Sequence, residues 1–148
     1  MGRIPALKIG LGVVCVCLIA CATQPSSPKI ASQSMGFTPE QVMVADITKL
    51  DKPAPKPAPF SRDRLAALWT ILEKGQPSEP ATLRPVYLIE LDSGSSFASQ
   101  RLLIYVQQDG YARMVRGDDH RSYSFRDDAL FSFAAETYKS ALQRGNRR

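Results

Sequence analysis

The stretch Arg101–Arg116, RLLIYVQQDGYARMVR, decides the fold that the sequence predicts. Apolar residues alternate along its first half, with Leu102, Ile104 and Val106 on one side, as in a strand that buries one face. Asp109-Gly110 is a strong signal for a tight hairpin turn, and the six residues after it have the composition of a second strand. The stretch therefore predicts two antiparallel strands joined at 109–110.

The flanking residues extend this hairpin into a small α+β domain over residues 60–148. Val86–Leu91 predicts another strand, and His120–Phe125 predicts a short fourth strand. One helix is expected before the strands, from the cap residue Ser61 to Lys74-Gly75, and another after them, starting near Ser124. The predicted order is helix, three- or four-stranded antiparallel sheet, helix, in two layers with both helices on one face of the sheet.

Each predicted helix carries an apolar stripe that should pack on the sheet. The stripe residues are Leu65, Leu68, Trp69 and Leu72 in the first helix, and Leu130, Phe131, Ala134, Tyr138 and Ala141 in the second. Trp69 is expected in the core, with a ligand-stacking role as the alternative. The last helix should carry Asp127 and Asp128 in its first turn, where the helix dipole favours negative charge.

Residues 21–59 are rich in proline, serine and alanine and are predicted to form a tether. As a flexible coil, a segment of this length spans roughly 35 Å. Within it, Thr38 and Pro39 have the pattern of a helix start, and Met43, Ile47 and Leu50 follow at helical spacing. A short helix is therefore expected over residues 38–50. Its apolar face would dock either on the chain's own domain or in a groove of a partner.

The first twenty residues have the features of an export signal. Arg3 and Lys8 precede an uncharged run, Ile9–Ala20, which is shorter than the roughly 20 apolar residues of a membrane-spanning helix. The run ends in Leu18-Ile19-Ala20-Cys21, which resembles the lipobox of bacterial lipoproteins.

The resemblance implies removal of residues 1–20 as a signal peptide and attachment of diacylglycerol and an N-acyl chain to Cys21. These lipids are the expected membrane anchor, and no other cofactor is predicted. Ala22, in place of the aspartate that retains such proteins in the inner membrane, implies an outer-membrane location with the domain facing the periplasm.

Signal removal changes the cysteine and charge balance of the chain. The whole chain carries three cysteines and a formal charge of +5. Cys15, Cys17, Arg3 and Lys8 leave with the signal, so the mature charge is +5 − 2 = +3 and the lipid uses the one remaining thiol. The folded part therefore has no cysteine for a disulfide, a nucleophile or a zinc site.

The sequence offers few groups for catalysis, and no catalytic or metal-ligating residues are predicted. Asp118-Asp119-His120 is the one acid–histidine cluster, and it lies in a predicted turn, so solvated charge is favoured over a hydrolase site. Glu90 and Asp92 face one side of a strand, either as a carboxylate pair or as a solvated strand end. Neither an enzyme activity nor a small-molecule substrate is expected.

The charges favour a protein partner over a nucleic acid. Arg113 shares one side of its strand with Tyr111 and Val115 and could bind an anionic partner, but residues 59–148 hold 13 basic and 11 acidic groups, a net charge of only +2. The residues expected to contact a partner are Met43, Ile47, Leu50, Arg113 and Arg116.

The function predicted from the sequence is that of a non-catalytic outer-membrane lipoprotein with a small periplasmic protein-binding domain. It would be an accessory or assembly factor of a secretion, conjugation or pilus machine. The alternative is a periplasmic inhibitor or immunity protein that acts on a cell-wall hydrolase or toxin, with a loop over residues 92–100 entering the active site.

Overall fold

The computed structural model describes residues 36, 38–51, 53–94, 100–117 and 120–145. A 3₁₀ turn, η1 (Pro39–Gln41), precedes the first strand. The strands are β1 (Val44–Lys49), β2 (Ala58–Pro59), β3 (Gln76–Pro77), β4 (Tyr87–Asp92), β5 (Arg101–Val106), β6 (Tyr111–Arg116) and β7 (Ser122–Arg126). The helices are α2 (Arg62–Lys74) and α3 (Asp128–Gly145).

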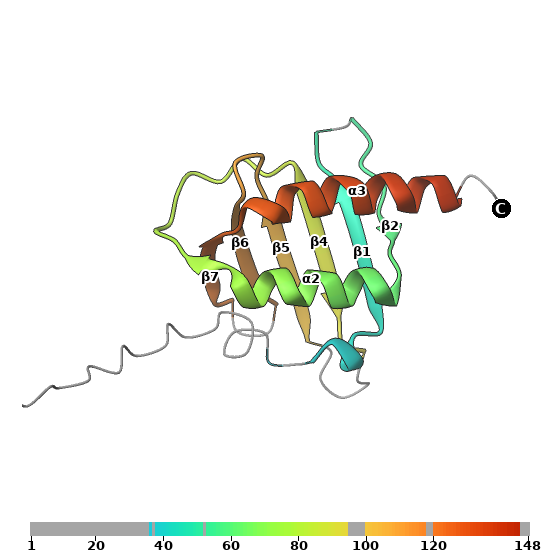
Figure 1. Cartoon of the computed structure of the whole chain (residues 1–148), viewed down its shortest axis with the longest axis horizontal. Helices are drawn as coiled ribbons and strands as arrows, with labels where there is room; N and C mark the ends of the chain where they lie inside the picture. The colour runs from blue at the N-terminus through green and yellow to red at the C-terminus, as the bar shows by residue number, and fades with distance from the viewer. Residues whose placement is uncertain (1–35, 37, 52, 95–99, 118–119, 146–148) are drawn as a thin grey trace, which may run out of the picture.

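The strands form one antiparallel sheet in the order β2-β1-β4-β5-β6-β7-β3 (Figure 1). The hairpin predicted at 109–110 is confirmed and joins β5 to β6. Gly110 has φ +77°, which glycine adopts without steric cost, and the Tyr111 backbone N–H donates to the Asp109 carboxylate at 3.1 Å.

The four predicted strands correspond to β4–β7, but the predicted total of three or four strands is too low. The described residues contain seven strands, because β1 lies beside β4 and two-residue strands extend each edge of the sheet. Two paired residues, as in β2 and β3, are too short for a sequence pattern with a period of two to be recognised.

The helix predicted over residues 38–50 is wrong beyond residue 41. The start signal forms locally, since the Thr38 backbone N–H donates to Gln41 Oε1 at 2.8 Å, but the helical turn ends after Gln41. Residues 44–49 instead pair with all six residues of β4. A helix there would have left the backbone N–H and C=O groups along one edge of β4 without partners. The hydrogen bonds formed by pairing that edge stabilise the strand more than the apolar spacing of the segment favours a helix. The folded domain therefore begins before residue 60, the boundary predicted between tether and domain.

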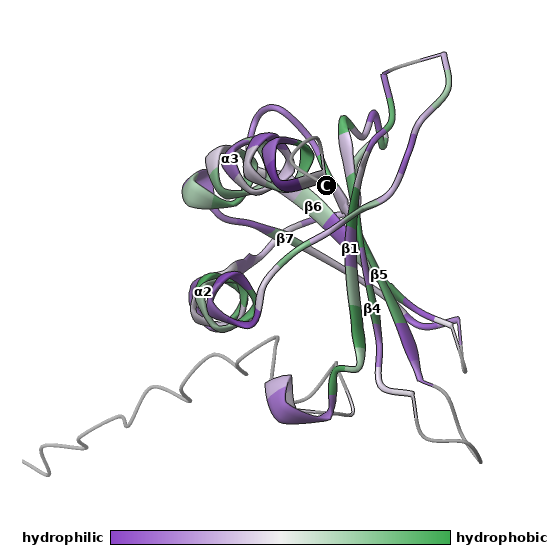
Figure 2. Ribbon diagram, turned by 90° about the vertical axis from the view of Figure 1, so that its right-hand side faces the viewer, coloured by the Kyte–Doolittle hydropathy of each residue, from purple (hydrophilic) through white to green (hydrophobic). Residues whose placement is uncertain are grey.

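Both helices lie on one face of the sheet, as predicted (Figure 2). The stripe residues Leu65, Leu68, Leu72, Leu130, Ala134, Tyr138 and Ala141 are buried, whereas Trp69 and Phe131 are half-buried against the core. Gly75 ends α2 close to the Phe125 ring, where a Cβ atom would lie 2.7 Å from a ring carbon.

The start predicted for the last helix, near Ser124, is too early because that residue belongs to β7. Helix α3 begins at Asp128, where the Asp127 carboxylate accepts a hydrogen bond from the Ala129 N–H at 2.8 Å. Residues up to Arg126 pair with β6 and therefore stay extended. The helix can begin only after them, where Asp127 caps its first turn.

Candidate functional site

The sheet face opposite the two helices is the candidate site, and no described helix lies on it (Figure 2). We call it the open face. Successive side chains of a strand point to opposite faces of the sheet, so the pairing of the strands shows which residues lie on the open face. They are Val44, Asp46 and Thr48 of β1, Leu88, Glu90 and Asp92 of β4, Arg101, Leu103 and Tyr105 of β5, Tyr111, Arg113 and Val115 of β6, and Ser122, Ser124 and Arg126 of β7.

Four apolar residues form the centre of the open face. Leu88 lies directly across from Tyr105, and Leu103 lies directly across from Val115. All four side chains are half-buried, in contrast to the fully buried residues that alternate with them on the same strands. These four residues supply partly accessible apolar area on a hydrogen-bonded platform of paired strands.

Carboxylates gather on the β1 and β4 side of the open face. Asp46 lies directly opposite Glu90, so two negative side chains occupy one cross-strand pair. Partial burial, and secondly the Glu90 charge, raise the pKa of the Asp46 carboxyl above its ordinary value. Glu90 in turn accepts a hydrogen bond from the Arg101 guanidinium, and Asp92 lies in register with Arg101.

Arginines gather on the β5–β7 side. Arg113 donates to the Ala81 carbonyl at 3.1 Å, and Arg126 donates to the Asp109 carboxylate at 2.9 Å. Tyr111, which is 1% exposed, donates to the Ser124 hydroxyl at 2.9 Å and accepts from the Ala81 N–H at 3.0 Å.

The hydrogen bonds around Tyr111 show how one corner of the open face is covered. Burial opposes ionisation of the Tyr111 phenol, but the hydrogen bonds to its oxygen outweigh burial and lower its pKa. Ala81 contacts both Tyr111 and Arg113, so the connection between β3 and β4 crosses this corner of the open face.

The residues predicted to contact a partner do not form one surface. Ile47 is 0% exposed and packs in the core, so it is unavailable to a partner, whereas Met43 is 68% exposed and Leu50 is half-buried after β1. Arg113 lies on the open face with Tyr111 and Val115, as predicted. Arg116 pairs in register with the buried Leu102 and so belongs to the opposite face.

The cross-strand pair of Asp46 and Glu90 was not predicted. Its discovery requires β1 to be recognised as a strand, and the local signals of residues 38–50 indicated a helix. Glu90 and Asp92 share one side of β4, as predicted. The carboxylate directly across from Glu90 is that of Asp46, which belongs to β1.

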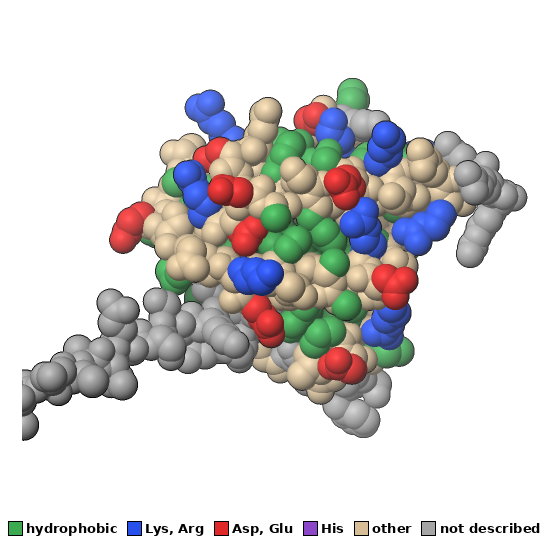
Figure 3. All heavy atoms as spheres, in the orientation of Figure 1, with side chains coloured by type: hydrophobic (Ala, Val, Ile, Leu, Met, Phe, Trp, Pro, Cys, Tyr) green, Lys and Arg blue, Asp and Glu red, His purple; other side chains and the backbone are tan. Residues whose placement is uncertain are grey.

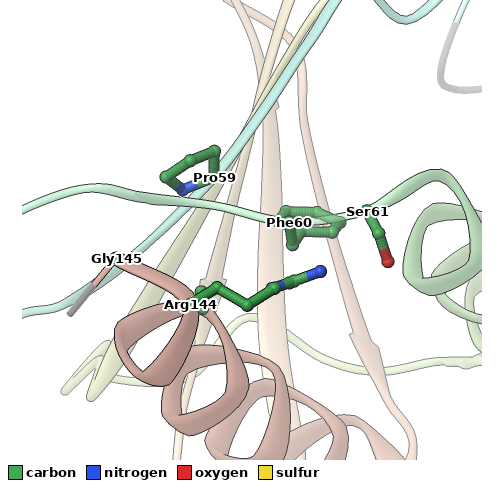
Figure 4. A pocket seen from close by; sticks show the side chains of 6 residues that line it. Pro59, Phe60, Ser61, Arg144 and Gly145 are labelled. Carbon is green, nitrogen blue, oxygen red and sulfur yellow. The ribbon is translucent and has the colours of Figure 1, made fainter. Parts of the chain in front are cut away.

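A hollow of about 290 Å³ lies between the start of α2 and the end of α3 (Figure 4). Its lining residues are Pro59, Phe60, Ser61, Ala141, Arg144 and Gly145. This combination offers an aromatic wall, a hydroxyl and a cation. These lining residues include no acid, histidine or cysteine that could activate the Ser61 hydroxyl.

The predicted acid–histidine cluster is only partly within the described structure. His120 is exposed in the turn between β6 and β7, with φ +55°, and its backbone N–H donates to the Arg116 carbonyl at 3.1 Å. Asp118 and Asp119 lie outside the described residues, as do Cys21 and the predicted signal peptide. The described part of the chain contains no group of three or more potential metal ligands and no helix suited to crossing a membrane.

Comparison with known proteins returned no similarity. The chain matches no protein-family model, and no curated protein or solved structure resembles it significantly.

Proposed function

We propose that this protein is a non-catalytic outer-membrane lipoprotein that is anchored through Cys21 and binds protein in the periplasm through its open face. The observation that carries the binding role is the half-buried apolar centre of a sheet face with no described helix on it. The location rests on the lipobox resemblance of residues 18–21.

The open face suits protein recognition because its shape is fixed before binding. Six residues of β1 pair with β4, and six residues of β4 pair with β5, so the backbone beneath the surface is held by continuous ladders. A preordered surface loses little conformational entropy on association. Leu88, Leu103, Tyr105 and Val115 supply apolar contact area, and the flanking charges supply orientation.

An accessory role in a secretion, conjugation or pilus machine follows from this combination. A lipid anchor would restrict the domain to the membrane surface, and the residues between Cys21 and η1 would provide reach. A tethered domain with a protein-binding face can hold another envelope protein beside the membrane, where the tether raises the effective concentration of the two partners.

Affinity purification of the tagged full chain from detergent-solubilised membranes tests the proposal. We expect a stoichiometric envelope protein that is retained by the unaltered chain and lost with Leu103→Arg, which places a cation in the apolar centre. Ala67→Arg, on the exposed side of α2, is the matched control and should retain the partner. Recovery of no partner contradicts the accessory role, and equal recovery with Leu103→Arg contradicts the use of this face.

A periplasmic inhibitor or immunity protein is the second candidate. Its loop would be the connection between β4 and β5, of which residues 95–99 lie outside the described residues. The described ends of this connection are joined, because the Ser93 backbone N–H donates to the Gln100 carbonyl at 3.1 Å. A loop with a fixed base can enter an enzyme's active site at low entropic cost. Failure of the protein to inhibit any cell-wall hydrolase in a panel would exclude action on that class of enzyme.

A further inference from the structure

We propose that the open face binds a second copy of this chain, with the two sheets packed face to face about a two-fold axis parallel to the strands. The inference rests on the proposed function, because it names the partner of the same face. It is carried by the distribution of charge across the five central strands.

Opposite charges occupy opposite halves of the open face. The carboxylates Asp46, Glu90 and Asp92 come from β1 and β4, whereas the guanidinium groups Arg101, Arg113 and Arg126 come from β5, β6 and β7. Since the strand order is β1-β4-β5-β6-β7, the face is acidic on one side and basic on the other, with equal numbers of each charge.

The helix side of the molecule lacks this separation. Basic and acidic side chains are interspersed across the surface of α2 and α3, with apolar side chains between them (Figure 3). Arg64 and Glu136, 3.4 Å apart, form a contact between opposite charges across the two helices. The open face also has one such contact, Arg101 with Glu90, where its acidic and basic halves meet. The charge polarity that a second copy could use is therefore a property of the open face.

A two-fold axis makes this polarity self-complementary. An axis parallel to the strands and between β4 and β5 places β1 of one copy over β6 of the other, and β4 over β5. In that arrangement Asp92 of one copy meets Arg101 of the other, and Asp46 lies over Val115, two residues along β6 from Arg113. An axis across the strands would instead place carboxylates over carboxylates.

The same axis matches the apolar residues. Leu88 and Tyr105 occupy the same register position on β4 and β5, so each would lie over the other residue type in the second copy. Two packed sheets lie about 10 Å apart, a spacing that side chains of this size fill. Anchoring in one membrane raises the effective concentration of the two copies, so a contact of modest area is sufficient.

Charge reversal with complementary rescue tests the proposal. Two full-length chains with different affinity tags are co-expressed, and the fraction of one that co-purifies with the other is measured. Asp46→Lys in both copies, or Arg113→Glu in both copies, should lower that fraction about tenfold, because like charges then face each other across the interface with an offset of only two residues. One copy of each variant should restore it, because the heterodimer contains only opposite-charge contacts at these positions.

Two controls separate the interface from general effects of charge and folding. Glu73→Lys and Lys139→Glu reverse charges on exposed positions of α2 and α3 and should leave co-purification unchanged. In membranes treated with a bismaleimide whose spacer spans about 10 Å, Leu103→Cys, next to the two-fold axis, should give a cross-linked dimer. Ala67→Cys on the helix side and the chain without an added cysteine should give none.

The outcomes distinguish this inference from the proposed function. Co-purification that survives either reversal, or complementary variants that stay apart, overturns self-association. If the tagged copies stay apart while a different stoichiometric protein is retained and then lost with Leu103→Arg, self-association is wrong and the protein-binding function stands. If the copies associate as predicted and no other protein is recovered, self-association stands and the accessory role is wrong.

Discussion

Two residues of the open face repel each other, an interaction that contributes nothing to the stability of the fold. Asp46 and Glu90 are like charges in one cross-strand pair, and Asp46 is also partly buried. Like charges directly opposite each other destabilise a sheet. A second copy that brings Arg113 close to Asp46 would relieve this repulsion, which ties the residue-scale observation to the proposed interface.

Asp46→Asn should stabilise the fold at neutral pH by about 0.5 kcal/mol, within the range for cross-strand pairs. The pKa of Asp46 is raised in the folded state, first by burial and then by Glu90, so the folded state binds its proton more tightly than the unfolded chain does. The penalty is therefore complete above the raised pKa and disappears as the pH falls below the ordinary value of 3.8.

Urea unfolding of both chains between neutral and acidic pH measures this difference. The gain from Asp46→Asn should shrink as the pH falls through the raised pKa of Asp46. Glu73→Gln, at an exposed position of α2, is the control and should show little change at any pH. A gain that is absent at neutral pH, or that grows on acidification, contradicts the expectation.

At the scale of elements, β1 shows why local patterns misled. Pro39 and Gln41 form the predicted helical turn, yet residues 44–49 lie in the sheet between β2 and β4. The spacing of Met43, Ile47 and Leu50 suited a helix, but it is also compatible with a strand that buries one of them. Ile47 is the buried residue, and its direct neighbour across the sheet is Ile89 of β4.

Ile47→Ala should therefore lower the free energy of unfolding by about 3 kcal/mol, as expected for a large-to-small change in a packed core. Met43→Ala, four residues earlier and 68% exposed, should change it by less than about 0.5 kcal/mol. Denaturation followed through the fluorescence of Trp69, the one tryptophan of the chain, reports both values. Equal small effects would show that β1 is not part of the cooperative fold.

At the scale of the whole molecule, the proposed anchor and the open face would have to act together. The lipobox resemblance implies lipid attachment at Cys21, ahead of the folded domain. Two or three acyl chains give long-lived membrane attachment, whereas one chain gives only marginal binding. Both the proposed partner contact and the proposed self-association depend on the concentration that such anchoring provides.

Cys21→Ser should abolish lipid attachment and signal removal at that position. Fractionation of cells that express the full chain, combined with metabolic labelling by a fatty acid, measures both effects. We expect label on the unaltered chain and none on Cys21→Ser, with altered mobility of the unprocessed variant. Cys17→Ser, within the signal, is the matched control and should be labelled normally. Normal processing and labelling of Cys21→Ser would refute the anchor.

The sequence by itself determined the elements whose signals are local. The Asp109-Gly110 turn, the alternation along β4–β6 and the apolar stripes of α2 and α3 are all encoded within a few residues of chain. These signals predicted three or four strands, two helices and the placement of both helices on one sheet face. They also predicted that Arg113, Tyr111 and Val115 share a face, because a strand alternates with a period of two.

Only the tertiary structure decided where β1 lies and, through it, the composition of the open face. The strand β1 is separated from its partner β4 by about 40 residues of chain, and pairing across such a distance leaves no mark in a local pattern. The backbone groups of β4 required a neighbour, and residues 44–49 supplied it against their helical spacing. That long-range pairing buried Ile47, brought Asp46 beside Glu90 and separated the charges of the open face into two halves.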